Sequence, residues 1–123
     1  MQNTLLTESH HPYEEQKGTC RVTSSQLAVT ITSYETAPVN DEVVLLNAVT
    51  NQPVSVAIDV AEQDFKFHQV IGYVTSEDAT KYWLIKNSWG GTWGNGGYMK
   101  LAREATVKGG ACGVARAASY PIA

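Results

Sequence analysis

The sequence contains few of the features that place a chain in a specialised class. No Lys or Arg has a Lys or Arg neighbour and the net charge is −3, so nucleic acid is not an expected partner. The longest apolar run is about four residues, far short of a membrane span, so no membrane partner is expected. Residues 1–4 lack the pattern of a signal peptide, which taken alone predicts a cytosolic product or a chain cut from a longer one.

Cysteine is scarce. Cys20 and Cys112 are the only two in the sequence, which excludes a disulfide-rich scaffold. Neither has a nearby His or Asp at the spacing of a metal site, and no cofactor is expected. Two alternatives remain open for the pair, namely two free or buried thiols or one mutual disulfide.

The 123 residues are enough for one domain at most. Asn40 is expected to cap a helix that ends at Gln52-Pro53. Residues 64–69 are expected to form a short amphipathic piece, and residues 70–74 and 81–86 a hairpin. One helix and about six strands predict an α+β fold, an antiparallel β-barrel or sheet with one packed helix.

The segment from Tyr82 to Tyr98 is the most informative part of the chain. It gathers three tryptophans and five glycines around Asn87. The apolar residues before Lys86 predict a buried strand, and the glycines allow sharp turns after it. The pattern predicts a polar side chain that is delivered by a strand and covered by indoles.

The motif Lys86-Asn87-Ser88-Trp89-Gly90 resembles the papain family of cysteine peptidases, plant type. Further motifs resemble the same family in the same order along nearly the whole chain: Pro12-Tyr13, Gly18-Thr19-Cys20, 52–59, Ile71-Gly72-Tyr73, Trp93-Gly94, Gly97-Tyr98, Cys112-Gly113 and 118–121. The resemblance implies the second half of such an enzyme. Residues 1–20 would be a crossover segment from an absent left domain, and residues 21–123 a right-hand β-barrel domain.

The family reaction needs a thiolate, an imidazole, a group that orients the imidazole, and donors for the oxyanion. The resemblance assigns the orienting role to Asn87 and the cover of its hydrogen bond to Trp89. Trp93 matches the aromatic floor of the leaving-group side. Ala57 and Ala117 match the pocket for an apolar substrate side chain. The structural alternatives are a turn asparagine, core indoles and core alanines.

The chain departs from the family at the catalytic residues. The nucleophile motif belongs to the absent left domain, and Cys20 and Cys112 match structural cysteines whose partners this chain lacks. Between Phe67 and Val70 a loop and strand are missing. The family histidine stands six residues before the glycine that matches Gly72, where this chain has Lys66.

His68 is the only histidine near that position. Its side chain has the correct strand parity, but the expected displacement is two residues, or about 6.6 Å, beyond hydrogen-bond reach. It is therefore expected to be a solvated histidine at the end of a short helix, with a substitute base as the alternative. Val74 and Ala79 stand where relatives have glycine, so turns that need φ > 0 would change.

These features predict a papain-like cysteine peptidase by descent that is inactive alone. A polypeptide substrate is implied by the family. The alternatives are a non-catalytic module that docks on a papain-like left domain or an intact peptidase, and a fragment without a stable fold. Relatives act in vacuoles, lysosomes or outside the cell, but the compartment of this chain is not predicted.

Overall fold

The computed structural model describes residues 4–7, 9–10, 12, 14, 16–19, 29–59 and 65–123. The chain divides into two compact units. The first comprises Met1–Tyr34 with Pro121–Ala123, and the second Glu35–Tyr120.

The first unit contains a small antiparallel pair of strands, β1 (Thr4–Leu5) and β2 (Val29–Thr30). Near the C-terminus the Thr32 N–H donates to the carbonyl of Ile122 at 2.8 Å. The expected strand over residues 21–34 is broken where it is described, since Ile31 and Thr32 separate β2 from the next strand; residues 21–28 lie outside the described residues.

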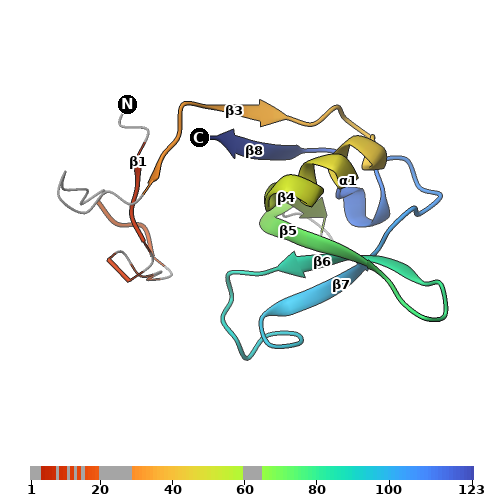
Figure 1. Ribbon diagram of the computed structural model, residues 1–123. Helices are drawn as coiled ribbons and strands as arrows, with labels where there is room; N and C mark the ends of the chain where they lie inside the picture. Colours follow the sequence, from red (N-terminus) through yellow and green to blue (C-terminus); the bar gives the residue numbers. More distant parts are fainter. Residues whose placement is uncertain are drawn as a thin grey trace. The chain divides into compact units, whose positions relative to one another are not determined.

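A six-stranded sheet and one helix form the main architecture (Figure 1). The strands in spatial order are β3 (Ser33–Thr36), β8 (Ala118–Ile122), β4 (Val54–Asp59), β5 (Phe65–Thr75), β6 (Lys81–Lys86) and β7 (Tyr98–Ala102). The helix, α1 (Glu42–Asn51), contacts β4 and β5, and a short 3-10 turn, η2 (Ala111–Gly113), contacts β4. The predicted α+β class with an antiparallel sheet and one helix is confirmed. No helix in the described part of the chain is long and apolar enough to cross a membrane.

The helix begins one residue later than predicted. Asp41, not Asn40, is the N-cap, and its carboxylate accepts the N–H groups of Val43 and Val44 at 3.0 Å each. Asn40 instead has φ of 65°, a left-handed conformation that asparagine tolerates. The helix ends before Gln52, as expected from the following proline.

The core lies in the second unit, between α1 and one face of the sheet. Its largest fully buried side chains are Trp83, Leu45, Ile58, Ile85, Val54, Val56, Val70 and Val114. In β4 the side chains of Val54, Val56 and Ile58 belong to this core. On the other face Ser55 and Asp59 are exposed, but Ala57 is buried as well.

β5 replaces the predicted amphipathic piece with a continuous strand. It runs from Phe65 to Thr75 and pairs antiparallel with β4 along one edge and β6 along the other. The pairing with β6 shifts between Val70 and Gly72, so Ile71 forms a bulge. The expectation of a short helix over residues 64–69 is therefore wrong for residues 65–69, because this segment pairs with β4 as a strand.

The hairpin between β5 and β6 is confirmed. Ser76 and Thr80 close its turn through a backbone hydrogen bond of 2.9 Å. Ala79 adopts φ of 63°, so the turn keeps a left-handed residue although the side chain is not glycine. Val74 has no positive φ and lies in the strand, so the second expected departure causes no left-handed strain.

Candidate functional site

Asn87 follows directly after β6 and is 6% exposed. Its backbone N–H donates to the Gly97 carbonyl at 3.0 Å, which closes the loop from residue 87 to residue 97. Its side-chain oxygen Oδ1 accepts the Trp89 N–H at 3.1 Å. Its side-chain nitrogen Nδ2 is buried and has no hydrogen-bond partner among the described residues. The resemblance implied that this oxygen accepts a histidine N–H; in the structure it binds the Trp89 backbone.

Glycine is required where the loop after Asn87 closes on itself. Gly94 has φ of 55°, and a Cβ there would lie 2.6 Å from the Tyr98 carbonyl oxygen. Gly97 has φ of 89°, and a Cβ there would lie 3.3 Å from the Gly90 carbonyl oxygen. These close approaches explain why positions 94 and 97 are glycine.

Aromatic rings gather beside Asn87. The Trp89 ring meets the Trp93 ring edge-on, with centroids 5.3 Å apart and an interplanar angle of 90°. The Trp89 ring also meets the His68 ring edge-on at 6.1 Å. Trp89 is 41% exposed, so one side of this cluster faces solvent while Asn87 is enclosed.

His68 lies within β5 and is only 5% exposed. The expectation of a solvated histidine at a helix end is therefore wrong. Gln69 pairs with Lys86 across β5 and β6, so the residue before Gln69 is level with the residue after Lys86, namely Asn87. Counting residues from Gly72 missed this because of the bulge at Ile71. A glycine inside a strand pattern often marks a bulge, so Gly72 was the available signal.

The two pocket alanines are brought to neighbouring strands. The Ala57 N–H donates to the Ala117 carbonyl at 3.0 Å. Ala57 is 7% exposed, whereas Ala117 is exposed and lines a hollow of about 390 Å³. The other lining residues are Thr36, Ala37, Val39, Ser55, Arg116, Ala118 and Ser119.

Cys112 is a free, exposed thiol in η2 with φ of 49°. The alternative of a mutual disulfide with Cys20 is therefore wrong for this structure; Cys20 itself lies outside the described residues. Lys66 belongs to β5, but its side chain is not among those that the structure describes. Within the described ranges, no group of three His, Cys, Asp or Glu side chains could hold a metal ion.

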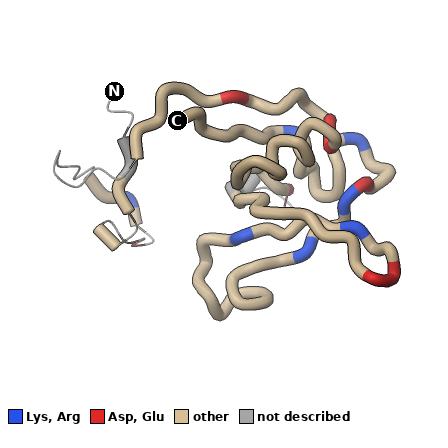
Figure 2. The backbone as a smooth tube through the Cα atoms, viewed as in Figure 1, with Lys and Arg blue, Asp and Glu red and all other residues tan. Residues whose placement is uncertain are grey.

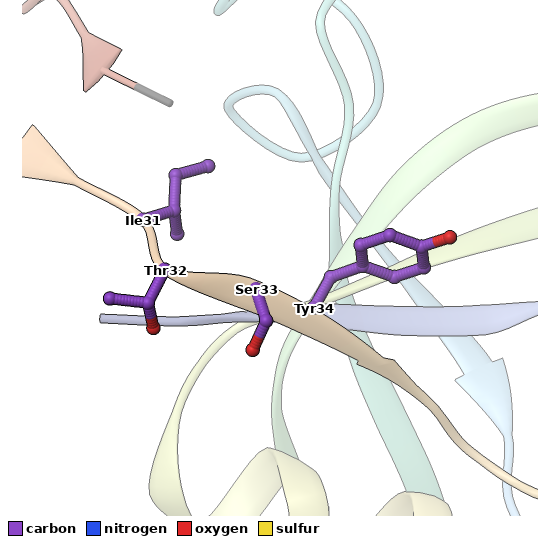
Figure 3. A pocket seen from close by; sticks show the side chains of 4 residues that line it. All are labelled: Ile31, Thr32, Ser33 and Tyr34. Carbon is purple, nitrogen blue, oxygen red and sulfur yellow. The ribbon is translucent and has the colours of Figure 1, made fainter. Parts of the chain in front are cut away.

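Two other surface features are poorer candidates. A hollow of about 320 Å³ in the first unit is lined by Ile31, Thr32, Ser33 and Tyr34 (Figure 3). These consecutive side chains fan out from one extended segment rather than converge, and Tyr34 is 74% exposed. Charged residues are scattered over several elements, and residues 87–98 carry none (Figure 2).

Comparison with known proteins shows the family of this chain. The family model "Papain family cysteine protease" matches residues 1–70 and 67–122. The chain is 45% identical to vignain of Vigna mungo over 136 aligned positions, which cover 96% of this chain and 38% of vignain. It is 41% identical to the cysteine endopeptidase Rep1 of Oryza sativa subsp. japonica, over 96% of this chain and 37% of that protein. The chain thus spans well under half the length of these relatives.

Solved structures agree with the sequence relatives. The bromelain protease from Ananas comosus in complex with the E64 inhibitor matches with a TM-score of 0.84 and 30% identity, over 98% of this chain and 63% of that one. Digestive procathepsin L 3 of Tenebrio molitor matches with a TM-score of 0.83 and 36% identity, over 96% of this chain and 44% of that one. The chain therefore belongs to the papain family of cysteine proteases.

Proposed function

We propose that this chain is the histidine-orienting half of a papain-type peptidase and that it hydrolyses no peptide by itself. The burial of Asn87 beside Trp89 carries this proposal. A carboxamide that is held by the Trp89 N–H and enclosed at 6% exposure is suited to fixing the orientation of an imidazole, and the His68 ring lies against the Trp89 ring.

The described residues supply no thiol beside Asn87. The sequence has two cysteines, and the one within the described residues, Cys112, lies in η2 rather than on β5, on β6 or in the loop that follows β6. A thiol becomes a strong nucleophile when an adjacent group lowers its pKa. Without a thiol beside the imidazole, the acyl-transfer step has no starting point.

An internal loss accounts for the unusual spacing before Gly72. The 136 positions aligned with vignain exceed the 123 residues of the chain, so at least 13 of them have no counterpart here. Residues 67–70 are matched both at the end of the first family segment and at the start of the second. Both observations support a loss around Phe67 that joins two family segments within β5 and leaves Lys66 at the family histidine position.

The test combines turnover with two thiol reagents on the purified chain. A fluorogenic peptide with an apolar side chain is expected to show no hydrolysis above buffer, while an intact papain-family peptidase serves as the positive control. An epoxide probe, which requires an activated thiolate, is expected to leave Cys112 unlabelled, whereas iodoacetamide labels it. The Cys112→Ser variant is the matched control. Peptide turnover accompanied by epoxide labelling of either cysteine would overturn the proposal.

A second candidate is a non-catalytic module that docks on a papain-like left domain or on an intact peptidase. The exposed hollow beside Ala117 favours it, because Val39 at its edge is 65% exposed and Ala37 adds further apolar surface. Titration calorimetry against an intact family member and against its isolated left domain tests this candidate. Micromolar binding that Val39→Asp weakens would support docking, and no heat of binding to either protein would refute it.

A further inference from the structure

We propose that Asn95 is a site of spontaneous chemical modification, at which the chain converts its own asparagine to isoaspartate and thereby destabilises the loop from residue 87 to residue 97. The reactants are the side chain of Asn95, the backbone nitrogen of Gly96 and water. The inference goes beyond the proposed function and does not depend on it, because the reaction needs neither a thiol nor an imidazole. Asn95-Gly96 is the only Asn-Gly dipeptide in the sequence.

The dipeptide begins a tight turn in the loop between β6 and β7 (Figure 1). Asn95 and Tyr98 close this turn: the Asn95 N–H donates to the Tyr98 carbonyl at 2.9 Å, and the Tyr98 N–H donates to the Asn95 carbonyl at 3.2 Å. Gly96 and Gly97 lie between them with φ of 63° and 89°, both positive, as the central residues of a type I′ turn must be. The Asn95 side chain therefore directly precedes a glycine in a turn that two hydrogen bonds close.

The two reacting groups are exposed and are not held by other groups. Asn95 and Gly96 are both exposed. Among the described residues, no hydrogen bond involves the Asn95 carboxamide or the Gly96 N–H. A Cβ at Gly96 would meet no atom within 4 Å, so there is space for a new ring on that side. Because the two residues are adjacent in the chain, rotation about the Asn95 torsions alone brings the Gly96 nitrogen to the side-chain carbon Cγ.

The reaction needs no cofactor. The Gly96 nitrogen gives its proton to water and attacks Cγ of Asn95; the N–Cγ bond forms, the Cγ–Nδ2 bond breaks, and ammonia leaves a five-membered succinimide ring. Water then opens the ring. Cleavage at the original backbone carbonyl gives isoaspartate, and cleavage of the new N–Cγ bond gives aspartate. A glycine in second position favours ring closure, because it has no Cβ to obstruct the attack and its backbone rotates freely.

Two other asparagines show how the fold prevents the same reaction. Asn87 is 6% exposed, and its Oδ1 accepts the Trp89 N–H at 3.1 Å, so its carboxamide is held in place. Asn51 is the last residue of α1, and its Nδ2 donates to a helix carbonyl at 2.9 Å. The nitrogen that would attack Asn51, that of Gln52, also donates to a helix carbonyl, at 3.2 Å. Asn95 has none of these restraints.

Isoaspartate at position 95 changes the backbone where the turn closes. It adds a methylene to the main chain and turns the Asn95 carbonyl, which accepts the Tyr98 N–H, into a free carboxylate. The same turn contains Gly97, whose carbonyl accepts the Asn87 N–H at 3.0 Å. The carboxylate also brings a negative charge into residues 87–98, which carry none. The modification therefore weakens the hydrogen bond that closes the loop at Asn87.

Peptide mapping of the purified full chain tests the reaction without any variant. The chain is incubated at mildly alkaline pH, mass spectrometry then measures deamidation at each asparagine, and an isoaspartyl methyltransferase detects the isoaspartate. A sample digested at time zero corrects for reaction during digestion. Asn95 is expected to react at least about tenfold faster than Asn87 or Asn51, because those two must first be released by local unfolding. Equal rates at the three positions, or no product at Asn95, would overturn the proposal.

Hydrogen exchange tests the effect on the loop. In the incubated wild-type chain, the Asn87 N–H is expected to exchange about tenfold faster than in the fresh chain, because the bond to Gly97 is weakened. The variant Asn95→Gln should keep the slow exchange after the same incubation, since its side chain would have to close a less favourable six-membered ring. Asn51→Gln is the matched control and should behave like the wild type. An equal acceleration in the incubated Asn95→Gln chain would contradict the proposed effect.

Discussion

Ala79 occupies a backbone conformation that glycine adopts at almost no cost. Its φ of 63° lies in the left-handed region, where a Cβ comes too close to the following carbonyl oxygen. The turn nevertheless keeps this conformation, because the Ala79 N–H donates to the Ser76 carbonyl and the Ser76 N–H to the Thr80 carbonyl, both at 2.9 Å. The strain therefore persists at a residue whose backbone is held on both sides.

Replacing Ala79 with glycine should stabilise the chain. Relief of left-handed strain contributes about 1–2 kcal/mol, offset by about 0.4–1 kcal/mol for the freer unfolded chain, so a gain of about 0.5–1 kcal/mol in the free energy of unfolding is expected. Urea titration measures it. Ala105, which has no positive φ, is the matched position. Ala105→Gly should be neutral or destabilising, and an equal gain in both variants would contradict the explanation.

A charge in the same turn should make stability depend on pH. The Ser76 hydroxyl and then the Thr80 N–H donate to Asp78, which lowers the pKa of its carboxyl group. A lowered folded-state pKa means that the contribution is fully present above the unfolded value and is lost as pH falls through the folded value. The stability cost of Ser76→Ala should therefore be largest near neutral pH and shrink in the acid range.

Thermal melts of the wild-type chain and of Ser76→Ala measure this at several pH values between about 7 and 2, a range that spans the ordinary aspartate pKa. The exposed Ser55→Ala variant is the control, because its effect should not vary with pH. A difference between wild type and Ser76→Ala that grows on acidification would contradict the assigned cause. A hydrogen bond from Lys81 also lowers the pKa of Glu104. Glu104 is present in each chain, so its pH-dependent contribution to stability cancels in the comparison.

At the scale of elements, one buried polar contact joins α1 to β6. The Trp83 side chain is fully buried, and its Nε1–H donates to Glu42 Oε1 at 3.0 Å. Glu42 lies in the first turn of α1, where a carboxylate also interacts favourably with the helix dipole. The helix is thus anchored to the sheet by a directional bond in addition to apolar contact.

Trp83→Phe should destabilise the chain strongly. The variant removes the hydrogen bond to a carboxylate, worth about 1.5–3 kcal/mol, and leaves a cavity at a fully packed site, so a loss of about 3 kcal/mol or more is expected. Glu42→Gln is the matched variant, because its amide oxygen still accepts the indole N–H, and about 1 kcal/mol should be lost. Equal losses measured by urea titration would contradict this explanation, because Glu42→Gln leaves the packing of Trp83 intact.

The elements also show how far the sequence could predict the structure. α1 and the hairpin of β5 and β6 follow from local signals, namely a capping region, a proline and a turn between apolar runs. β5 does not, because its first half is a strand only through pairing with β4. The same pairing buries His68. Asn87 was predicted from its motif, whereas its neighbour depends on a register that local patterns do not specify.

For the whole molecule, the distribution of buried side chains predicts where cooperative stability lies. Among the described residues, every buried member of the hydrophobic core lies between Leu45 and Ala118. This range falls within the unit Glu35–Tyr120, whereas the described side chains of β2 are exposed. Apolar burial supplies most of the folding free energy, so the second unit should unfold as one cooperative body.

A chain reduced to residues 35–120 is therefore expected to keep a single thermal transition and the near-ultraviolet circular dichroism of the buried Trp83. It loses the ends of β3 and β8, so the melting temperature should fall, but only by several degrees, about the effect of 1–2 kcal/mol in a domain of this size. The destabilised variant Trp83→Phe, made in both lengths, should shift both transitions by a similar amount, because its contacts lie inside the retained unit. Loss of the transition in the shortened chain would mean that the first unit is part of the same cooperative body. It would also mean that the loop and the aromatic side chains around Asn87 depend for their folding on residues far from them in the sequence.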